Sequence, residues 1–479
     1  MCAMKKYDVI VIGSGGGSKI TSPAAKLGLK VASIEKDRLG GTCLNRGCIP
    51  SKMLIHPAYL ATHIKEAHKF DIHLNPNFSV DFAKLITRIS QTVDADSDQI
   101  ETGYKRNPNI DFYPVSARFI DNKTLEVNGE KITADKIFIA TGARPSIPNI
   151  PGLEGTPYMT STEALRNLKL PKRLIVLGAG YIAVELGYAY RALGSEVHFL
   201  VRSKFLRAED TQVADEFTRV FTQLCNVHFG AVPSRVEYND GMFRVTYQKQ
   251  DGGTEQLNAD ALLVATGVTP NTDNLGLENT SIQRTEKGFL KVDDHLRTAV
   301  PGVWAMGDCV GNYLFRHSVN FEGEYLFRTI FTEKKDEPLR YPPVPHAVFS
   351  YPQIAGVGKT EEQLKKEGAD YVVGLNPYKS SGMGMALLSD HGFCKILIDR
   401  KDRRILGAHI VGEEASDMIH ILIAFMNKQG TIDDLLNMIY IHPALPEIVR
   451  NAARKAQTTL ENEKFPDLRE SGYPGIRKQ

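Results

Sequence analysis

Two cysteines, Cys43 and Cys48, lie five positions apart within residues 40–52, a stretch that also contains glycine and proline. On a regular helix such residues are about 8 Å apart, whereas a disulfide tolerates Cα separations of roughly 4.4–6.8 Å. The pair can therefore form a bond only where the first helical turn is distorted, which Asn45 and Gly47 would permit. We interpret the pair as a redox-active disulfide that is easily reduced. Two buried, inert thiols are the alternative that the cysteines alone leave open.

The length and composition describe an ordinary globular protein. A chain of 479 residues predicts roughly three domains of about 150 residues each. With 24% charged residues and a net charge of +2, neither nucleic acid nor a membrane surface is expected as a partner. The six cysteines are scattered apart from the one close pair, which favours a reducing compartment. The apolar run at 9–12 is too short for a signal or membrane segment, so we expect a cytoplasmic enzyme, without a metal site.

A βαβ pattern that is typical of dinucleotide binding begins near the N-terminus. Residues 7–12 predict a buried parallel strand, a helix follows up to about residue 27, and 30–34 predict a second strand. The intervening loop would bring bare backbone to a pyrophosphate at a helix N-terminus. An acid about 20 residues later binds a ribose hydroxyl in such folds. The residues in these positions are Gly13, Gly15, Gly16 and Glu35.

A second pattern of the same kind spans residues 173–201, with Gly178 and Gly180 in its loop. The strand at 196–201 is followed by Arg202 and Arg207 instead of a carboxylate. Arginines would bind a 2′-phosphate, which a carboxylate would repel, so NADPH is expected as the donor in preference to NADH. Two solvated surface arginines are the alternative.

The two regions end with the same sequence pattern. A buried strand leads to Thr141-Gly142 in the first region, and a similar strand leads to Thr266-Gly267 in the second. This repetition indicates duplicated nucleotide-binding folds. A further strand at 303–306 leads to Asp308, which could accept a hydrogen bond from a ribityl hydroxyl of a flavin, near the N-terminus of a following helix.

Proline residues at 342–343 mark a change of composition, and the strands and helices beyond them predict an α+β domain. We therefore expect an α/β protein with two Rossmann-like domains and a C-terminal α+β domain. Residues 465–479 lack periodicity and predict a loose tail. The expected division of the chain is 1–150, 151–275, 276–343 and 344–479, with the first and third segments forming one domain.

These motifs, together with residues 178–185, 305–308 and the His442-Pro443 pair with Glu447, resemble the FAD-dependent pyridine nucleotide-disulfide oxidoreductases. That group includes dihydrolipoamide dehydrogenase, glutathione reductase and mycothione reductase. The resemblance implies a homodimer whose subunits each have an FAD domain, an NAD(P) domain and a dimerisation domain. It also implies that electrons pass from the nicotinamide through flavin to the disulfide, and then to a small disulfide or dithiol substrate.

The resemblance assigns roles to individual residues. Cys48 would lie against the flavin, and Cys43 would attack the substrate disulfide. His442 would be the acid/base, supplied by the partner subunit and oriented by Glu447. The further implied residues are Lys52 near the flavin, paired with Glu185; Tyr181 as a gate to the nicotinamide pocket; Gly13, Gly15, Gly16, Glu35, Gly41, Thr42, Thr141, Gly142 and Asp308 for FAD; and Gly178, Gly180, Arg202, Arg207 and Gly267 for NAD(P).

The substrate follows less directly. Segments such as 406–410 and 442–447 look like mycothione reductase, whereas 43–52 look more like dihydrolipoamide dehydrogenase, which usually uses NAD. The last residues, 475–479, lack the cysteine pair expected of a mercuric reductase. We therefore expect a mycothione-reductase-like enzyme, with dihydrolipoamide dehydrogenase as the second candidate and a low-turnover redox sensor as the third. Arg46, between the cysteines, either favours thiolate and anionic substrates or is solvated.

Overall fold

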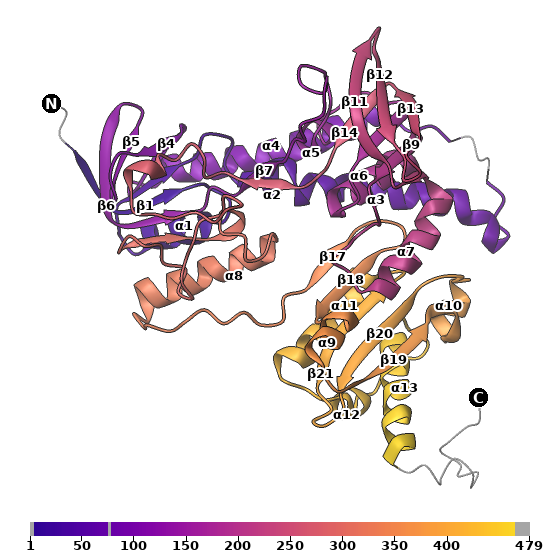
Figure 1. Ribbon diagram of the computed structural model, residues 1–479. Helices are drawn as coiled ribbons and strands as arrows, with labels where there is room; N and C mark the ends of the chain where they lie inside the picture. Colours follow the sequence, from indigo (N-terminus) through magenta and orange to yellow (C-terminus); the bar gives the residue numbers. More distant parts are fainter. Residues whose placement is uncertain (1–3, 75–77, 465–479) are drawn as a thin grey trace.

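The computed structural model describes residues 4–74 and 78–464 (Figure 1). Its N-terminal part is a seven-stranded sheet of order β3-β2-β1-β6-β5-β4, with β16 also paired to β6. Strand β1 is a central strand with a parallel neighbour at each edge, and its apolar end is buried on both faces. The elements are β1 (Lys5–Ile12), α1 (Ser18–Lys26), β2 (Val31–Ile34), β3 (Ile110–Tyr113), β4 (Ala117–Phe119), β5 (Thr124–Val127), β6 (Glu130–Ile139) and β16 (Val303–Ala305).

A second sheet, of order β10-β9-β8-β14, is parallel throughout and repeats this arrangement. The antiparallel strands β11-β12-β13 form a separate sheet, and β7 pairs with β15 in a third. The elements are β7 (Ala143–Pro145), α5 (Ser161–Ala164), β8 (Arg173–Leu177), α6 (Tyr181–Leu193), β9 (Glu196–Val201), α7 (Thr211–Leu224), β10 (Asn226–Phe229), β11 (Val232–Asn239), β12 (Met242–Gln248), β13 (Thr254–Ala259), β14 (Ala261–Val264) and β15 (Val268–Pro270).

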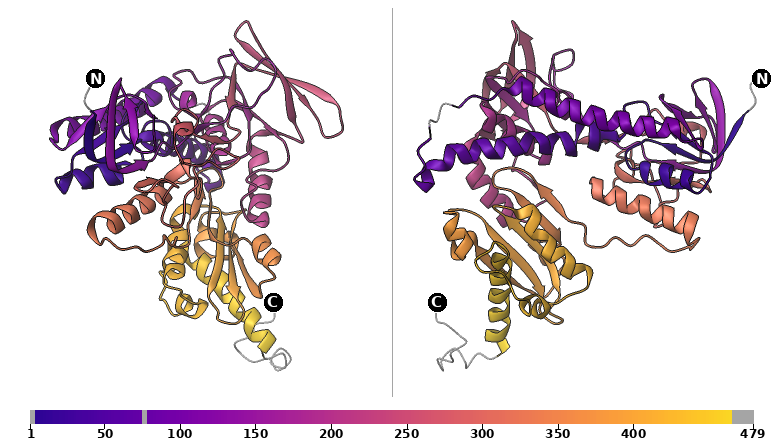
Figure 2. Two further views of the ribbon diagram at one scale, coloured as in Figure 1. Left: turned by 60° about the vertical axis from the view of Figure 1, so that its left-hand side comes forward. Right: turned by 180° about the vertical axis from the view of Figure 1, so that it is seen from behind.

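Two long helices run between these sheets, as the rear view in Figure 2 shows. They are α3 (Cys48–Glu66), which follows the short α2 (Gly41–Arg46), and α4 (Phe82–Arg106). Helix α3 packs against α4 on one side and α6 on the other. The buried side chains of Leu54, Ile55 and Ala58 belong to the same hydrophobic cluster as those of α6. The cysteine-bearing end of α3 is thereby fixed against the second nucleotide-binding fold.

The C-terminal part is a five-stranded antiparallel sheet of order β17-β18-β21-β20-β19. Helix α13 packs on β19 and β20, while α11 packs on β18 and β21, which confirms the expected α+β class. The elements from α8 onward are α8 (Arg316–Phe327), β17 (His346–Val348), β18 (Ile354–Gly358), α9 (Glu361–Glu367), β19 (Tyr371–Pro377), α10 (Gly382–Ala386), β20 (Phe393–Asp399), β21 (Ile405–Val411), α11 (Ala415–Asn427), α12 (Ile432–Leu436) and α13 (Pro446–Lys464).

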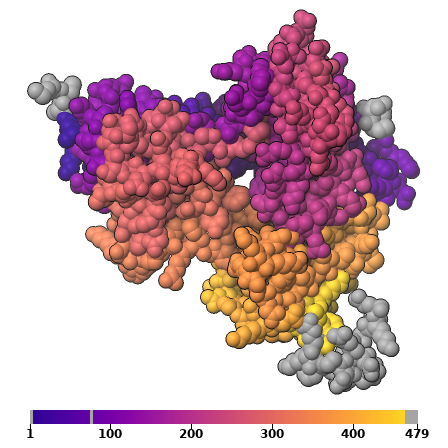
Figure 3. All heavy atoms as spheres, viewed as in Figure 1, coloured from indigo at the N-terminus to yellow at the C-terminus, as the bar shows by residue number. Residues whose placement is uncertain are grey.

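The surface view shows these parts as three lobes (Figure 3). Strands β1 to β6 and residues from about 276 to 340 gather in one lobe, because β16 completes the sheet that contains β1, whereas α3 reaches the lobe of the second fold. Within the described ranges, no helix combines the length and apolar character needed to cross a bilayer. The division of the chain at 150, 275 and 343 stays a prediction, and the expected tail at 465–479 lies outside the described residues.

Candidate active site

The chain leaves helical geometry between the two cysteines. Helix α2 ends at Arg46 and α3 begins at Cys48, with Gly47 between them at φ −141° and ψ −119°. A Cβ atom on Gly47 would lie 2.8 Å from the carbonyl oxygen of Thr42, so glycine is needed at this break. Both cysteines are thiols in this structure; Cys48 is exposed and Cys43 is partly buried. The distortion that the spacing predicts is therefore present.

The two thiols share a proton unequally. A hydrogen bond from Cys48 lowers the pKa of Cys43 to about 7; burial opposes this shift, and the positive charges of Arg316 and Lys52 add to it. The pKa of Cys48 is raised because its proton is held by Cys43 and because the surrounding atoms keep water from much of its sulfur. The pair therefore carries one thiolate near neutral pH, and the thiolate is the nucleophilic form of cysteine. Arg316, the first residue of α8, was not found by sequence reasoning.

The first glycine loop lies against the cysteine-bearing stretch. A Cβ on Gly41 would lie only 2.6 Å from the Cα of Gly15, so bare backbone meets bare backbone here. Gly13 has φ +101°, and a Cβ there would lie 2.2 Å from the carbonyl oxygen of Ala140. Gly16 belongs to the same loop, which leads into the N-terminus of α1. Such a side-chain-free cradle at a helix N-terminus fits the pyrophosphate of a dinucleotide.

Strand register brings the remaining flavin-site residues to the same sheet edge. Ile12 of β1 pairs with Ile34 and Ile139, so Glu35 and the Thr141-Gly142 turn emerge beside the glycine loop. The Glu35 carboxylate accepts hydrogen bonds from the amide and hydroxyl of Ser14, each at 2.9 Å. Asp308 follows β16, and burial raises its pKa to about 6 while Arg316 opposes the shift. A partly buried carboxyl of this kind fits a ligand hydroxyl group.

The second fold repeats the geometry of the first. Gly178 has φ +139°, and a Cβ there would lie 2.2 Å from the carbonyl oxygen of Ala265. Gly180 precedes α6, whose first residue is Tyr181. The pairing of Leu177 with Leu200 and Val264 brings the positions after β9 and β14 to the same edge, as in the first fold. The residues placed there are Gly178, Gly180, Gly267, Arg202 and Arg207; both arginines are exposed, and Arg207 donates a hydrogen bond to Ser203.

An ion pair joins the cysteine helix to the second fold. The ammonium group of Lys52 lies 2.6 Å from Oε2 of Glu185, which is buried on α6. Oε1 of Glu185 accepts a hydrogen bond of 3.0 Å from the backbone amide of Phe349. Lys52 Nζ also lies 4.2 Å from the centre of the Phe349 ring. The predicted pair thus meets the C-terminal part at Phe349, a residue that sequence reasoning missed.

His442 lies between α12 and α13, where a buried carboxylate orients its ring. Its Nδ1 lies 3.0 Å and 3.1 Å from the two oxygens of Glu447. Burial raises the pKa of Glu447, but hydrogen bonds from His442, the Ala444 amide and Arg450 lower it by more, so the carboxylate is ionised. With Nδ1 bound to Glu447, Nε2 is the nitrogen that faces outward. The imidazole can therefore exchange a proton with whatever covers this surface.

One chain does not bring His442 to its own cysteines. Figure 1 places α2 between the two nucleotide-binding folds, whereas α10, whose Gly382 lies beside His442, is at the right-hand edge of the C-terminal part. The His442 side chain is 74% exposed, while Glu447 beside it is 4% exposed. Nearby Ile439 and Ile441 are 100% and 81% exposed. The thiol pair and the histidine therefore form two separate halves of the predicted set.

Within the described residues, Arg46 makes no hydrogen bond to the thiol pair or to His442. Its guanidinium donates to Asp37 at 2.6 Å. The charge that lowers the Cys43 pKa comes first from Arg316 and not from Arg46. The solvated alternative thus agrees better with this geometry, and a role for Arg46 in substrate choice stays a prediction.

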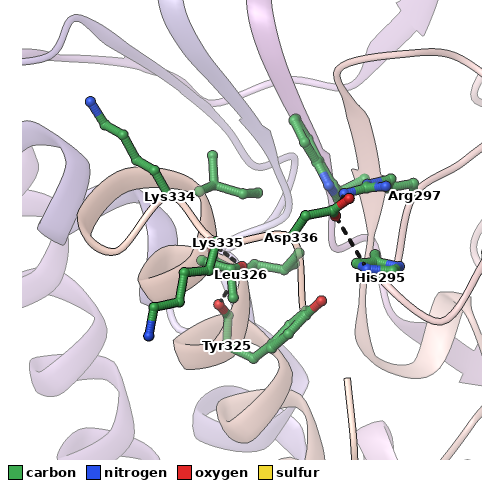
Figure 4. Close-up of a pocket in the computed structure, with 10 residues that line it drawn as sticks. His295, Arg297, Tyr325, Leu326, Lys334, Lys335 and Asp336 are labelled. Carbon is green, nitrogen blue, oxygen red and sulfur yellow. Dashed lines mark hydrogen bonds and ion pairs between the residues drawn. The ribbon is translucent and has the colours of Figure 1, made fainter. Parts of the chain in front are cut away.

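A cavity of about 240 Å³ lies away from these residues, beside β16 and α8 (Figure 4). Asp293, Asp294 and His295 beside it offer metal-ligand atoms within 4.8 Å of one another. His295 is already engaged, however, at 2.7 Å from Asp294 and 3.2 Å from Asp336. The cluster is better described as a network of ion pairs at the surface, and the absence of a metal site stays a prediction.

Comparison with known proteins agrees with this geometry. Residues 7–324 match the family described as pyridine nucleotide-disulphide oxidoreductase, and residues 344–453 match its dimerisation domain. A dihydrolipoyl dehydrogenase from Cupriavidus necator is 35% identical over 473 residues, covering 94% of this chain and 98% of that protein. Mycothione reductase from Mycobacterium tuberculosis is 35% identical over 472 residues, covering 94% and 99%. A solved Cu(II) complex of the HOCl-induced flavoprotein disulfide reductase RclA from Escherichia coli has a TM-score of 0.84 at 31% identity, covering 94% of this chain and 99% of that chain.

Proposed function

The chain belongs to the pyridine nucleotide-disulphide oxidoreductase family, whose members use FAD and NAD(P)H, and we propose that it reduces the disulfide of a small thiol with electrons from NADPH. The observation that carries this proposal is the thiol pair at the α2–α3 break. The pair lies beside the glycine cradle of the first fold, and the pKa of Cys43 is lowered to about 7. Inert structural thiols need neither a lowered pKa nor such a position.

Cys43 and Cys48 take different parts in the proposed reaction. The Cys43 thiolate attacks the substrate disulfide, forms a mixed disulfide and releases one thiolate, which takes a proton from His442. Cys48 then attacks Cys43, forms the Cys43–Cys48 disulfide and releases the second thiol. Bound FAD, once reduced by NADPH, would supply the two electrons that regenerate the thiols. The residues proposed to hold FAD are Gly13, Gly15, Gly16, Glu35, Gly41, Thr42, Lys52, Thr141, Gly142 and Asp308.

The partner subunit supplies His442 in this proposal. The matched dimerisation domain indicates a homodimer, and exposed Ile439 and Ile441 beside His442 are the kind of apolar surface that a second subunit covers. A His442 ring held by Glu447 but open on its Nε2 side is suited to a site completed across that interface. We place the enzyme in the cytoplasm as part of the same proposal.

Arg202 and Arg207 support NADPH as the electron donor. Both follow β9 at the edge where a dinucleotide ribose would lie, and both are exposed to a ligand. Gly178, Gly180 and Gly267 provide the backbone cradle at that edge, and Tyr181 would gate the nicotinamide. NADH is the less favoured donor because no carboxylate stands at the end of β9 to bind a 2′-hydroxyl.

Dihydrolipoamide dehydrogenase is the second candidate, favoured by relatives of that name at 35% identity over most of the chain. A redox sensor with little turnover is the third. A steady-state panel distinguishes all three: disulfides of mycothiol, glutathione and bacillithiol, together with lipoamide, each assayed with NADPH and with NADH. Cu(II) is included as an acceptor because the similar flavoprotein RclA was solved as a Cu(II) complex.

The proposed function predicts turnover of at least one low-molecular-weight disulfide, with NADPH preferred. Lipoamide turnover with NAD(H) alone would establish the second candidate instead. Rapid flavin reduction without turnover of any acceptor would favour the sensor. A strong preference for NADH would overturn the role given to Arg202 and Arg207.

A further inference from the structure

Glu209 is a buried carboxylate that bridges Tyr181 and His346. Its Oε1 accepts a hydrogen bond from the Tyr181 hydroxyl, and its Oε2 lies 2.8 Å from Nε2 of His346. The Glu209 side chain is 0% exposed and that of His346 is 16% exposed. The three residues come from different places: the start of α6, the connection from β9 to α7, and the start of β17. Glu209 therefore ties the second nucleotide-binding fold to the C-terminal part.

The surroundings keep this carboxylate charged. Burial raises the pKa of Glu209, but the hydrogen bond and positive charge of His346 and the hydrogen bond from Tyr181 lower it by more. Burial and the negative charge of Glu209 raise the pKa of Tyr181, so its hydroxyl keeps its proton. The Tyr181–Glu209 contact is thus a hydrogen bond to an ionised acceptor, which is stronger than a bond between neutral groups.

The Tyr181 ring is held separately from its hydroxyl. It stacks on Phe315 at 6.2 Å between ring centres and on His346 at 6.3 Å. Phe315 stacks in turn on His317 at 5.1 Å, and His317 Nε2 lies 2.8 Å from the carbonyl oxygen of Pro345. The aromatic contacts position the ring beside the N-terminus of α8, while Glu209 alone fixes the hydroxyl by a charged bond.

We propose that Glu209, itself held by His346, is a positioning residue for the nucleotide half of the reaction: it anchors the Tyr181 hydroxyl and sets how readily Tyr181 leaves the nicotinamide site. The inference rests on the proposed function, in which Tyr181 gates that site. Reduced nucleotide then breaks the Tyr181–Glu209 bond each time it enters. A protein that must first break such a bond binds its ligand more weakly than its open form does.

Two variants test the anchor in the FAD-loaded enzyme. Tyr181→Phe keeps the ring and removes the hydroxyl, and Glu209→Gln keeps the shape and removes the charge. The NADPH concentration that half-saturates the rate of flavin reduction, measured by anaerobic stopped-flow, is expected to fall about fivefold in each. The rate of reoxidation by the disulfide substrate is expected to stay unchanged. Glu255→Gln is the matched control, because Glu255 accepts a Tyr247 hydrogen bond of 2.6 Å in the β12–β13 pair, outside the site.

The double variant decides whether Glu209 acts through Tyr181. If it does, Glu209→Gln has no further effect in the Tyr181→Phe background, since the bond is already absent. An additional fivefold change there, or unchanged half-saturation in both single variants, would overturn the inference while leaving the proposed function standing. If neither NADPH nor NADH reduced the flavin of the unaltered enzyme, the proposed function would fail and the inference with it.

Discussion

The proposed site has a thiol half, which contains Cys43 and Cys48, and an imidazole half, which contains His442. The same kind of contact holds both halves, but the two differ in how exposed they are. Each contains a buried carboxylate beside a cation or potential cation: Glu185 beside Lys52, and Glu447 beside His442. The two carboxylate side chains are 10% and 4% exposed, yet the Lys52 side chain is 36% exposed and the His442 side chain 74%. The first half is therefore held between folds of its own chain, whereas the imidazole of the second half is turned outward.

The partners of the two carboxylates also differ in their distance along the chain. Lys52, Glu185 and Phe349 come from three parts of the molecule, while Glu447 binds His442, Ala444 and Arg450 from one short segment. The thiol half therefore depends on how the folds pack together. The imidazole half is formed locally, and in the proposed function it needs the second subunit only to meet the cysteines.

Replacing the nucleophile should produce the largest effect and separate the halves most sharply. Cys43→Ser is expected to lower disulfide reduction by about 10⁴-fold or more, since a hydroxyl is far less ionised than a thiol. Flavin reduction by NADPH should persist. Steady-state and stopped-flow rates measure the two steps, and Cys225→Ser, at a buried thiol of the second fold, serves as the control. If the Cys43→Ser variant still reduced the disulfide, the proposed mechanism would be wrong.

Removing the imidazole should have the next largest effect. His442→Ala is expected to lower the rate of disulfide reduction by about 10²–10⁴-fold, because the leaving thiolate loses its proton donor. The reduction of flavin by NADPH should change little, as α10, beside which His442 lies, is separate from the cysteine-bearing α2 in Figure 1. Glu447→Gln should cost less, since the ring remains. Equal losses in both half-reactions would show that His442 is structural.

Breaking the Lys52–Glu185 pair should have a smaller effect, seen in the reduction of flavin by NADPH. Lys52→Met leaves Glu185 as a buried carboxylate without its ammonium partner, and this should disturb the packing of α3 against α6. We expect flavin reduction by NADPH to slow about tenfold. Lys105→Met, which breaks an exposed pair with Glu101, is the control and should be neutral. A neutral Lys52→Met would mean that the pair does not support the site.

The charge around the thiols should be visible in their pH dependence. Because the pKa of Cys43 is lowered to about 7, alkylation of the reduced enzyme by iodoacetamide should rise as the pH passes upward through 7, where the thiolate forms. Arg316→Gln removes a positive charge and should move this midpoint to higher pH. A midpoint near 8.5, about the value of a free cysteine, would contradict the lowered pKa.

Sequence reasoning predicted the features that are determined by residues close together in the sequence. Three features depend on residues only a few positions apart. They are the glycine loops at Gly13 and Gly178, the break between Cys43 and Cys48, and the nearness of His442 to Glu447. The repeated strand-Thr-Gly pattern also predicted duplicated nucleotide-binding folds, and the strands that lead to the two Thr-Gly pairs, β6 and β14, lie in two separate sheets with parallel partners.

The rest depends on packing between distant segments, which no local pattern records. Arg316 influences Cys43 only because α8 packs near the first glycine loop, and Phe349 meets Glu185 only because the C-terminal part docks on α6. Glu209 was not singled out in the sequence, because its burial and its contacts with Tyr181 and His346 arise only in the folded chain. Such residues could have been predicted only with knowledge of which folds pack against each other.

Subunit mixing tests most directly whether the two halves combine across a dimer. Cys43→Ser and His442→Ala homodimers, each inactive, are dissociated together and allowed to reassociate. Random pairing yields hybrids in which one of the two sites has both an intact thiol pair and an intact imidazole, so about a quarter of the unaltered activity should return. If activity stayed at the level of the separate variants although hybrids had formed, His442 would serve the cysteines of its own chain and the central claim would be wrong.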